Sequence, residues 1–122
     1  MKRFKFSRET GKKVTHFDSH FIMTKLVMTD SATHVGMVYL ETGDVIGFHE
    51  AVVNQLLIVV DGAGEVRGET GSSLSISAGE AVFWEKGEGH ETKTAVGLTA
   101  LVVESETLQP HAMLEEIKGE PQ

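Results

Sequence analysis

The sequence predicts an all-β fold, arranged as a sandwich or a closed barrel. The chain contains 13 glycines and only 2 prolines, so it offers many positions for tight turns. Between the glycines lie short runs rich in Val, Ile, Leu, Thr and Phe, which are typical of strands. Several of these runs alternate apolar and polar residues, as strands with one exposed face should. Turn signals recur at a spacing of roughly ten residues, which favours a sandwich or barrel.

The predicted strands follow one another through most of the chain. Residues 62–64 and 70–72 are expected to form hairpin turns. Helical periodicity appears only after the last strand, where residues 110–117 are expected to form one short C-terminal helix that begins at Pro110. The tail, residues 119–122, is expected to be frayed. The predicted strands are 13–17, 21–28, 34–40, 45–49, 55–60, 64–69, 73–76, 81–84, 90–92 and 98–104.

Length and composition limit the class of protein. A chain of 122 residues fits one domain, and 40% hydrophobic residues are enough for one core. The net charge of −7 disfavours nucleic acid as a partner, because phosphate backbones repel an acidic surface. The absence of cysteine excludes disulfides and zinc–cysteine sites. The N-terminus lacks a signal-peptide pattern, and no apolar run approaches the ~20 residues of a membrane helix. We therefore expect a cytoplasmic protein with no membrane partner.

Two histidines are the best candidates for chemistry. His49 ends the predicted strand 45–49, and His90 begins the predicted strand 90–92. If these strands are neighbours in a barrel, both imidazoles can point into it. With an amide such as that of Gln55, they would form a site for a first-row divalent metal. The alternative is that each histidine is an ordinary hydrogen-bonded residue at the end of a strand.

The segment from residue 43 to residue 62 resembles the first sequence motif of the cupins. That motif reads Gly, five residues, His, one residue, His, three or four residues, Glu, six residues, Gly. Gly43, His49 and Gly62 match it in type and register. Ala51 stands where the second histidine belongs, and Gln55 stands where the glutamate belongs.

The segment from residue 79 to residue 94 resembles the second cupin motif. That motif reads Gly, five residues, Pro, one residue, Gly, two residues, His, three residues, Asn. Gly79, Gly87 and His90 match it. Glu85 replaces the proline and Thr94 replaces the asparagine.

The two motifs occur in the family's order, and together the resemblance implies a small cupin. The implied fold is a double-stranded β-helix, or jelly-roll barrel, around a cavity. The domain would span residues 1–122, with its motif-bearing core at about 34–104. The family's metal site uses three histidines and a carboxylate, whereas the ligands here are reduced to His49, Gln55 and His90. The resemblance therefore implies at most one weakly bound divalent transition metal, such as Mn, Fe, Ni or Zn.

Three functions stay open at this point. The first is a protein that binds a small molecule in its barrel and binds a divalent metal weakly. The second is a metal-dependent enzyme of the dioxygenase or isomerase type. The third is a non-catalytic interaction module. Small cupins are often homodimers, and the apolar side chains of Phe4, Phe6 and Phe17 near the N-terminus support the same expectation.

Overall fold

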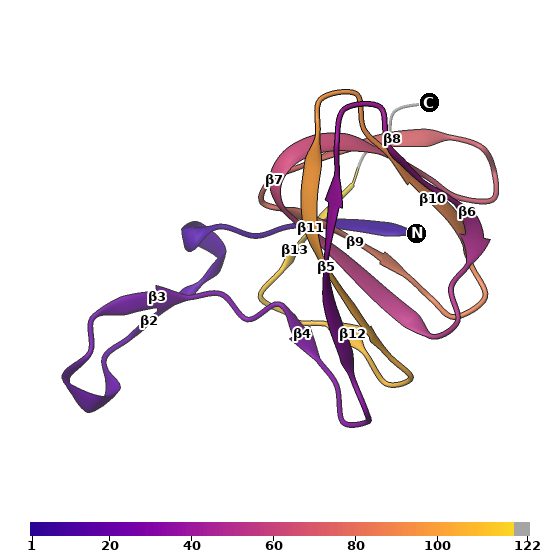
Figure 1. Cartoon of the computed structure of the whole chain (residues 1–122). Helices are drawn as coiled ribbons and strands as arrows, with labels where there is room; N and C mark the ends of the chain where they lie inside the picture. The colour runs from indigo at the N-terminus through magenta and orange to yellow at the C-terminus, as the bar shows by residue number, and fades with distance from the viewer. Residues whose placement is uncertain (119–122) are drawn as a thin grey trace.

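The computed structural model describes residues 1–118, which form a β-barrel and a hairpin arm that projects from it (Figure 1). Two antiparallel sheets build the barrel, and one long strand, β7 (Asn54–Arg67), belongs to both. The strands of the first sheet, in order, are β13 (Glu115–Ile117), β1 (Lys2–Lys5), β9 (Glu80–Trp84), β7, β11 (Leu98–Ser105) and β5 (His34–Leu40). The strands of the second sheet, in order, are β6 (Val45–Glu50), β10 (Gly89–Lys93), β7 and β8 (Ser73–Ser77). The predicted all-β fold is confirmed.

Strand β7 reaches both sheets because it bends instead of turning back. Val59 and Asp61 pair with consecutive residues of β11, so Val60 is the extra residue of a β-bulge. Gly62 then adopts a positive φ of 83°, which only glycine adopts at no steric cost. The hairpin turn predicted at 62–64 is therefore wrong, since these residues lie inside one continuous strand. The turn predicted at 70–72 is confirmed, and it joins β7 to β8 with Gly71 at a φ of 85°.

The alternation of side chains along these strands creates two apolar clusters. Leu57 and Val59 of β7 face the interior of the barrel, whereas Leu56 and Ile58 face outward. The buried residues of the interior cluster are Leu40, Ala51, Leu57, Val59, Val66, Ile76, Val82, Trp84, Leu98 and Ala100. The buried residues of the outer cluster are Leu56, Ile58, Ala81, Phe83, Val103, Leu108 and Leu114.

The C-terminal helix predicted at 110–117 does not form. These residues lie in β12 (Gln109–Pro110), a turn and β13, and β12 pairs with β4 (Val27–Met28). Leu108 and Leu114 pack on the outer face of the first sheet. The apolar residues whose spacing resembled that of a helix therefore belong to an extended segment instead. Only two short 3₁₀ turns, η1 (Arg8–Thr10) and η2 (His16–Asp18), are helical within residues 1–118. No helix in that part of the chain is long and apolar enough to cross a membrane.

The N-terminal third differs most from the prediction. The strand predicted at 34–40 has those bounds, but the one predicted at 21–28 divides into β3 (Phe21–Met23) and β4. Strand β2 (Lys12–Val14) pairs with β3 to form the projecting hairpin (Figure 1). Strand β1 was not predicted, and its Phe4 packs against the outer cluster together with Phe6. The frayed tail predicted at 119–122 lies outside the described residues.

Candidate functional site

A small cavity lies inside the barrel, between the two sheets. Its volume is about 170 Å³, and it takes side chains from five strands. The polar side chains on its wall include both of the histidines selected from the sequence, and the remaining walls are mostly aliphatic. The lining residues are Val38, Ile46, His49, Gln55, Leu57, His90, Thr92 and Val102.

The pairing of β6 with β10 brings the two imidazoles together. His49 and His90 are partners in register, and their ring centroids are 4.5 Å apart at an angle of 56°. His90 is buried, whereas His49 is exposed at the edge of the barrel. Gln55 lines the same cavity from β7. The structure therefore places the three residues selected from the sequence around one cavity; their role as metal ligands stays a prediction.

Main-chain carbonyl groups fix which nitrogen of each imidazole carries the proton. The Nδ1 atom of His49 lies 2.8 Å from the carbonyl oxygen of Gly47, and the Nδ1 atom of His90 lies 3.2 Å from that of Glu88. A carbonyl oxygen can only accept a hydrogen bond, so each Nδ1 donates. In the neutral form of each ring, the Nε2 atom then keeps its lone pair. Both histidines are thus prepared to accept a hydrogen bond or to bind a metal through Nε2.

His90 is held in a neutral, fixed state. The indole of Trp84 stacks on its ring with centroids 4.0 Å apart and planes 18° apart. Burial is the largest influence on the pKa of His90 and lowers it, and the nearby charge of His49 lowers it further. The carbonyl of Glu88 and the carboxylates of Glu88 and Glu104 act in the opposite direction, but the net pKa is below the ordinary value. His90 therefore stays unprotonated at neutral pH.

This lowered pKa predicts a loss of stability in mild acid. As the pH falls, the unfolded chain binds a proton at His90 before the folded chain does, so the free energy of unfolding decreases. The contribution of His90 should be constant above the unfolded pKa of about 6.5 and should decrease below it. The measurement is the urea midpoint as a function of pH for the wild type and the His90→Gln variant. The variant should lose part of the pH dependence, whereas a His111→Gln control should keep it. An unchanged pH profile in His90→Gln would contradict the assignment.

Gln55 connects the cavity to an acidic residue that the sequence motifs do not include. Its Nε2 atom donates a 2.8 Å hydrogen bond to the carboxylate of Glu104. Gln55 pairs in register with Trp84 on one side and with Glu104 on the other, so these side chains share the inner face of the first sheet. Glu104 pairs in turn with His34 on β5. Glu104 and His34 can be identified as neighbours of Gln55 only from this cross-strand register, because neither lies within the two motifs.

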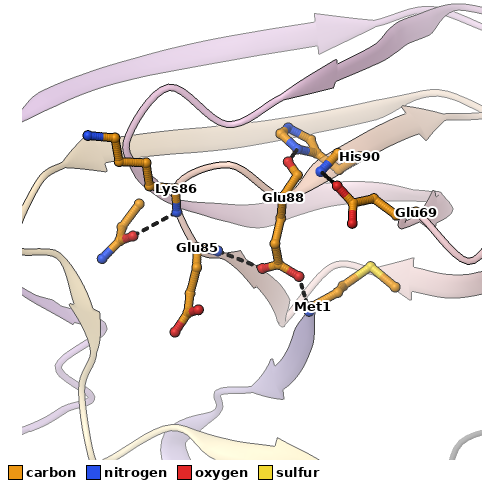
Figure 2. Close-up of polar contacts among 8 residues, drawn as sticks. Met1, Glu69, Glu85, Lys86, Glu88 and His90 are labelled. Carbon is orange, nitrogen blue, oxygen red and sulfur yellow. Dashed lines mark hydrogen bonds and ion pairs between the residues drawn. The ribbon is translucent and has the colours of Figure 1, made fainter.

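The turn that carries His90 has an acceptor for each of its main-chain amides. Figure 2 shows the contacts made by Met1, Glu69, Glu85, Lys86 and Glu88. The carboxylate of Glu88 accepts from the amide of Glu85 at 2.6 Å and from the ammonium group of Met1 at 2.6 Å. Burial alone would raise the pKa of this carboxyl group, but these two donors and the nearby charge of His90 together lower it. The other amides donate as follows: Lys86 to the Asn54 side chain, Gly87 to the Ala51 carbonyl, Glu88 to the Glu85 carbonyl and Gly89 to the Glu69 carboxylate.

These contacts explain the departures from the second motif. Glu85 stands where the motif has proline, and its amide donates a hydrogen bond that proline has no hydrogen to make. Thr94 stands where the motif has asparagine, and its hydroxyl donates to the Ala63 carbonyl at 2.6 Å. The same hydroxyl accepts from the amides of Val96 and Gly97. Both substitutions therefore stabilise turns and do not contribute a ligand to the cavity.

The residues present do not fit a tightly held metal. Within residues 1–118, no group of three or more His, Cys, Asp or Glu side chains is arranged to hold a metal ion. Ala51, at the position of the second motif histidine, is packed in the interior cluster with Trp84 and does not line the cavity. Two imidazole nitrogens and the amide of Gln55 would supply no negative charge to a dication. Weak metal binding is the most that this set allows.

Comparison with known proteins supports the fold but assigns no activity. No protein-family model and no curated protein matches the sequence. Solved structures do match. A cupin superfamily protein from Desulfitobacterium hafniense has a TM-score of 0.56 at 11% identity, over 65% of this chain and 74% of that one. A conserved protein with a double-stranded β-helix domain from Klebsiella pneumoniae has a TM-score of 0.56 at 16% identity, over 72% of this chain and 82% of that one. A cupin-2 domain protein from Shewanella frigidimarina has a TM-score of 0.52 at 18% identity, over 65% of this chain and 71% of that one. The chain therefore has the double-stranded β-helix fold of the cupins.

Proposed function

We propose that the barrel cavity binds a small uncharged organic molecule that carries a hydrogen-bond donor, such as a hydroxyl group. The observation that carries this proposal is the pair of adjacent imidazoles whose Nδ1 atoms are both committed to carbonyl oxygens. Each leaves an Nε2 lone pair as an acceptor. A ligand with a donor can satisfy these acceptors, and the aliphatic walls of Val38, Leu57 and Val102 can bury its carbon atoms.

The size of the cavity limits the ligand. A volume of about 170 Å³ equals that of roughly six water molecules at about 30 Å³ each. This is well below the ~300–1,000 Å³ of pockets that take drug-sized ligands. The ligand is therefore expected to be a compact molecule, comparable to one small ring with one polar substituent.

The charges near the cavity disfavour an anion. His90 is neutral at pH 7 because its pKa is lowered, so it supplies no positive charge. The carboxylate of Glu104 is hydrogen-bonded to Gln55, which lines the cavity, and the chain as a whole has a net charge of −7. An uncharged donor is therefore favoured over a carboxylate or phosphate.

A weakly bound divalent metal is the second part of the proposal. His49, His90 and Gln55 would hold it, with the two Nε2 atoms as its nitrogen ligands. The enzymatic alternative, a dioxygenase or isomerase, depends on this same metal and is disfavoured by the missing anionic ligand. We place the protein in the cytoplasm, a proposal supported by its cysteine-free composition.

Two probes that share one ring test this proposal: cyclopentanol and cyclopentanecarboxylate. Chemical shifts of the wild type at neutral pH should respond saturably to cyclopentanol, with the changes confined to His49, Gln55, His90 and Thr92. The carboxylate should bind at least tenfold more weakly. His49→Ala should weaken cyclopentanol binding, while His111→Ala should leave it unchanged. If the carboxylate binds best, or if no probe gives a saturable response at the cavity, the proposed ligand class is wrong.

The metal is tested separately by titrating Zn²⁺ or Ni²⁺ into the same variants. The wild type should bind weakly, and His49→Ala should abolish the binding detected at the cavity resonances. Tight binding by the wild type would contradict the proposal and would favour the enzymatic alternative.

A further inference from the structure

The side-chain amide of Gln55 has its orientation fixed by Glu104. The Nε2 atom of Gln55 donates its 2.8 Å hydrogen bond to a carboxylate oxygen of Glu104. A carboxylate can only accept hydrogen bonds, so the opposite orientation would place two acceptor oxygens against each other. The NH₂ group of Gln55 therefore faces Glu104. The Oε1 atom at the other end of the amide has no hydrogen-bond partner among residues 1–118.

This Oε1 atom is open to the cavity. Gln55 is only 7% exposed, and its side chain lines the cavity from β7. In the described part of the chain, the fully buried side-chain atoms without a partner include the Nε1 atom of Trp84 but not the Oε1 atom of Gln55. A small molecule in the cavity can therefore reach this oxygen, which is a strong hydrogen-bond acceptor.

Three acceptors thus belong to one small cavity. The Nε2 atoms of His49 and His90 have lone pairs in the neutral rings, because each Nδ1 donates to a carbonyl oxygen. The Oε1 atom of Gln55 is the third acceptor. The remaining side chains on the wall are aliphatic, apart from that of Thr92.

Thr92 supplies the one uncommitted side-chain donor on the described wall of the cavity. Its side chain is 1% exposed, and its hydroxyl forms no hydrogen bond with another residue in the range 1–118. The unpaired indole N–H of Trp84 is fully buried, and Trp84 does not line the cavity, so this donor is closed to a ligand. Three acceptors and one donor leave two acceptors that the wall itself cannot pair.

We propose that the cavity selects an uncharged molecule with two hydrogen-bond donors on neighbouring atoms, such as a vicinal diol, and that Glu104 is the positioning residue for this selectivity. The inference rests on the function proposed above and narrows its ligand class. The donors must be close together because His49 and His90 are register partners whose ring centroids are 4.5 Å apart. A ligand that only accepts hydrogen bonds would leave these buried acceptors unpaired, which weakens binding.

Three uncharged probes with the same ring test the ligand class: cis-1,2-cyclopentanediol, cyclopentanol and cyclopentanone. Each is titrated into the full chain at neutral pH and followed by chemical shifts at the cavity. The dissociation constant of the diol should be about tenfold lower than that of cyclopentanol, because the second hydroxyl pairs an acceptor that is otherwise left unsatisfied. Cyclopentanone should bind most weakly, since its oxygen can only accept.

The Glu104→Gln variant tests the role of Glu104. The new amide can donate to the Oε1 atom of Gln55, which frees the Gln55 amide to turn its NH₂ group toward the cavity. The ratio of diol affinity to cyclopentanone affinity should therefore decrease about tenfold, mainly because the ketone gains a donor. Glu106→Gln removes the same charge at a 62% exposed position that is ion-paired with Lys86, and it should keep the wild-type ratio. A merely structural role of Glu104 would weaken all three probes equally and leave the ratio unchanged.

A measurement on the wild type needs no variant. The NH₂ protons of Gln55 should show nuclear Overhauser contacts with the methylene protons of Glu104, because the two side chains are hydrogen-bonded. The absence of these contacts, or an unchanged affinity ratio in a folded Glu104→Gln variant, would overturn the role of Glu104.

The probes also separate this inference from the function on which it rests. Saturable binding of cyclopentanol at the cavity, with the diol no tighter or the ketone equally tight, would overturn the inference and leave the proposed function standing. The absence of a saturable response to all three probes would contradict the proposed function and this inference together.

Discussion

Replacing Trp84 by alanine is expected to reduce the free energy of unfolding by about 3–5 kcal/mol, the usual cost of removing a large buried aromatic side chain. The Trp84 side chain is fully buried in the interior cluster. Its ring also stacks on His90, so its removal opens the wall behind the cavity histidine. Urea unfolding followed by circular dichroism measures the change.

The Trp84→Phe variant separates the ring contacts from the indole N–H. The Nε1 atom has no hydrogen-bond partner among the described residues, so phenylalanine loses no hydrogen bond and removes a buried unpaired donor. Its cost should be about 1–2 kcal/mol, closer to that of a volume-conserving change. Val96→Ala, at a 72% exposed site, should cost less than about 0.5 kcal/mol. A Trp84→Ala variant as stable as Val96→Ala would contradict the packing described.

The second large effect is expected at Gly62, where β7 passes from one sheet to the other. The positive φ alone costs an alanine roughly 1–2 kcal/mol. In addition, a Cβ atom at this position would overlap the main-chain carbonyl of Gly97, and the backbone shift needed to relieve such overpacking costs about 1–3 kcal/mol. Gly62→Ala should therefore reduce the free energy of unfolding by about 2–5 kcal/mol, measured by urea denaturation.

Gly71 supplies the matched control. Its φ of 85° is close to that of Gly62, but a Cβ atom added to Gly71 would have no neighbouring atom within 4 Å. Gly71→Ala should therefore cost only the conformational term of roughly 1–2 kcal/mol. Equal losses in the two variants would show that the approach of Gly97 has no energetic effect at the corner of β7.

Local sequence patterns predicted strands and turns well where each is determined by residues that are adjacent in the sequence. Strand β5 has its predicted bounds, and the turn at Gly71 joins two neighbouring strands. The same rules failed at Gly62, because a glycine inside a bent strand and a glycine in a hairpin turn look alike in sequence. They failed again at Leu108 and Leu114, whose helix-like spacing is used to cover the outer face of the first sheet.

From the sequence, only the residues of the candidate site that lie within the two motifs could be predicted. Their spacing predicted that His49 and His90 would lie close together, and their ring centroids are 4.5 Å apart. Glu104 was not predictable, because its contact with Gln55 depends on the register between β7 and β11. The buried position of Ala51 was not predictable either, since it depends on packing with residues from several strands.

The protonation of the two imidazole rings tests the central claim most directly. A long-range ¹H–¹⁵N correlation spectrum at neutral pH distinguishes a protonated ring nitrogen from one with a lone pair. We expect the neutral rings of His49 and His90 both to carry the proton on Nδ1, because each Nδ1 contacts a carbonyl oxygen, and to have a lone pair on Nε2. A neutral ring of either histidine with its proton on Nε2 in the absence of ligand would contradict the claim, because the cavity would then lack the paired acceptors on which the proposed function depends.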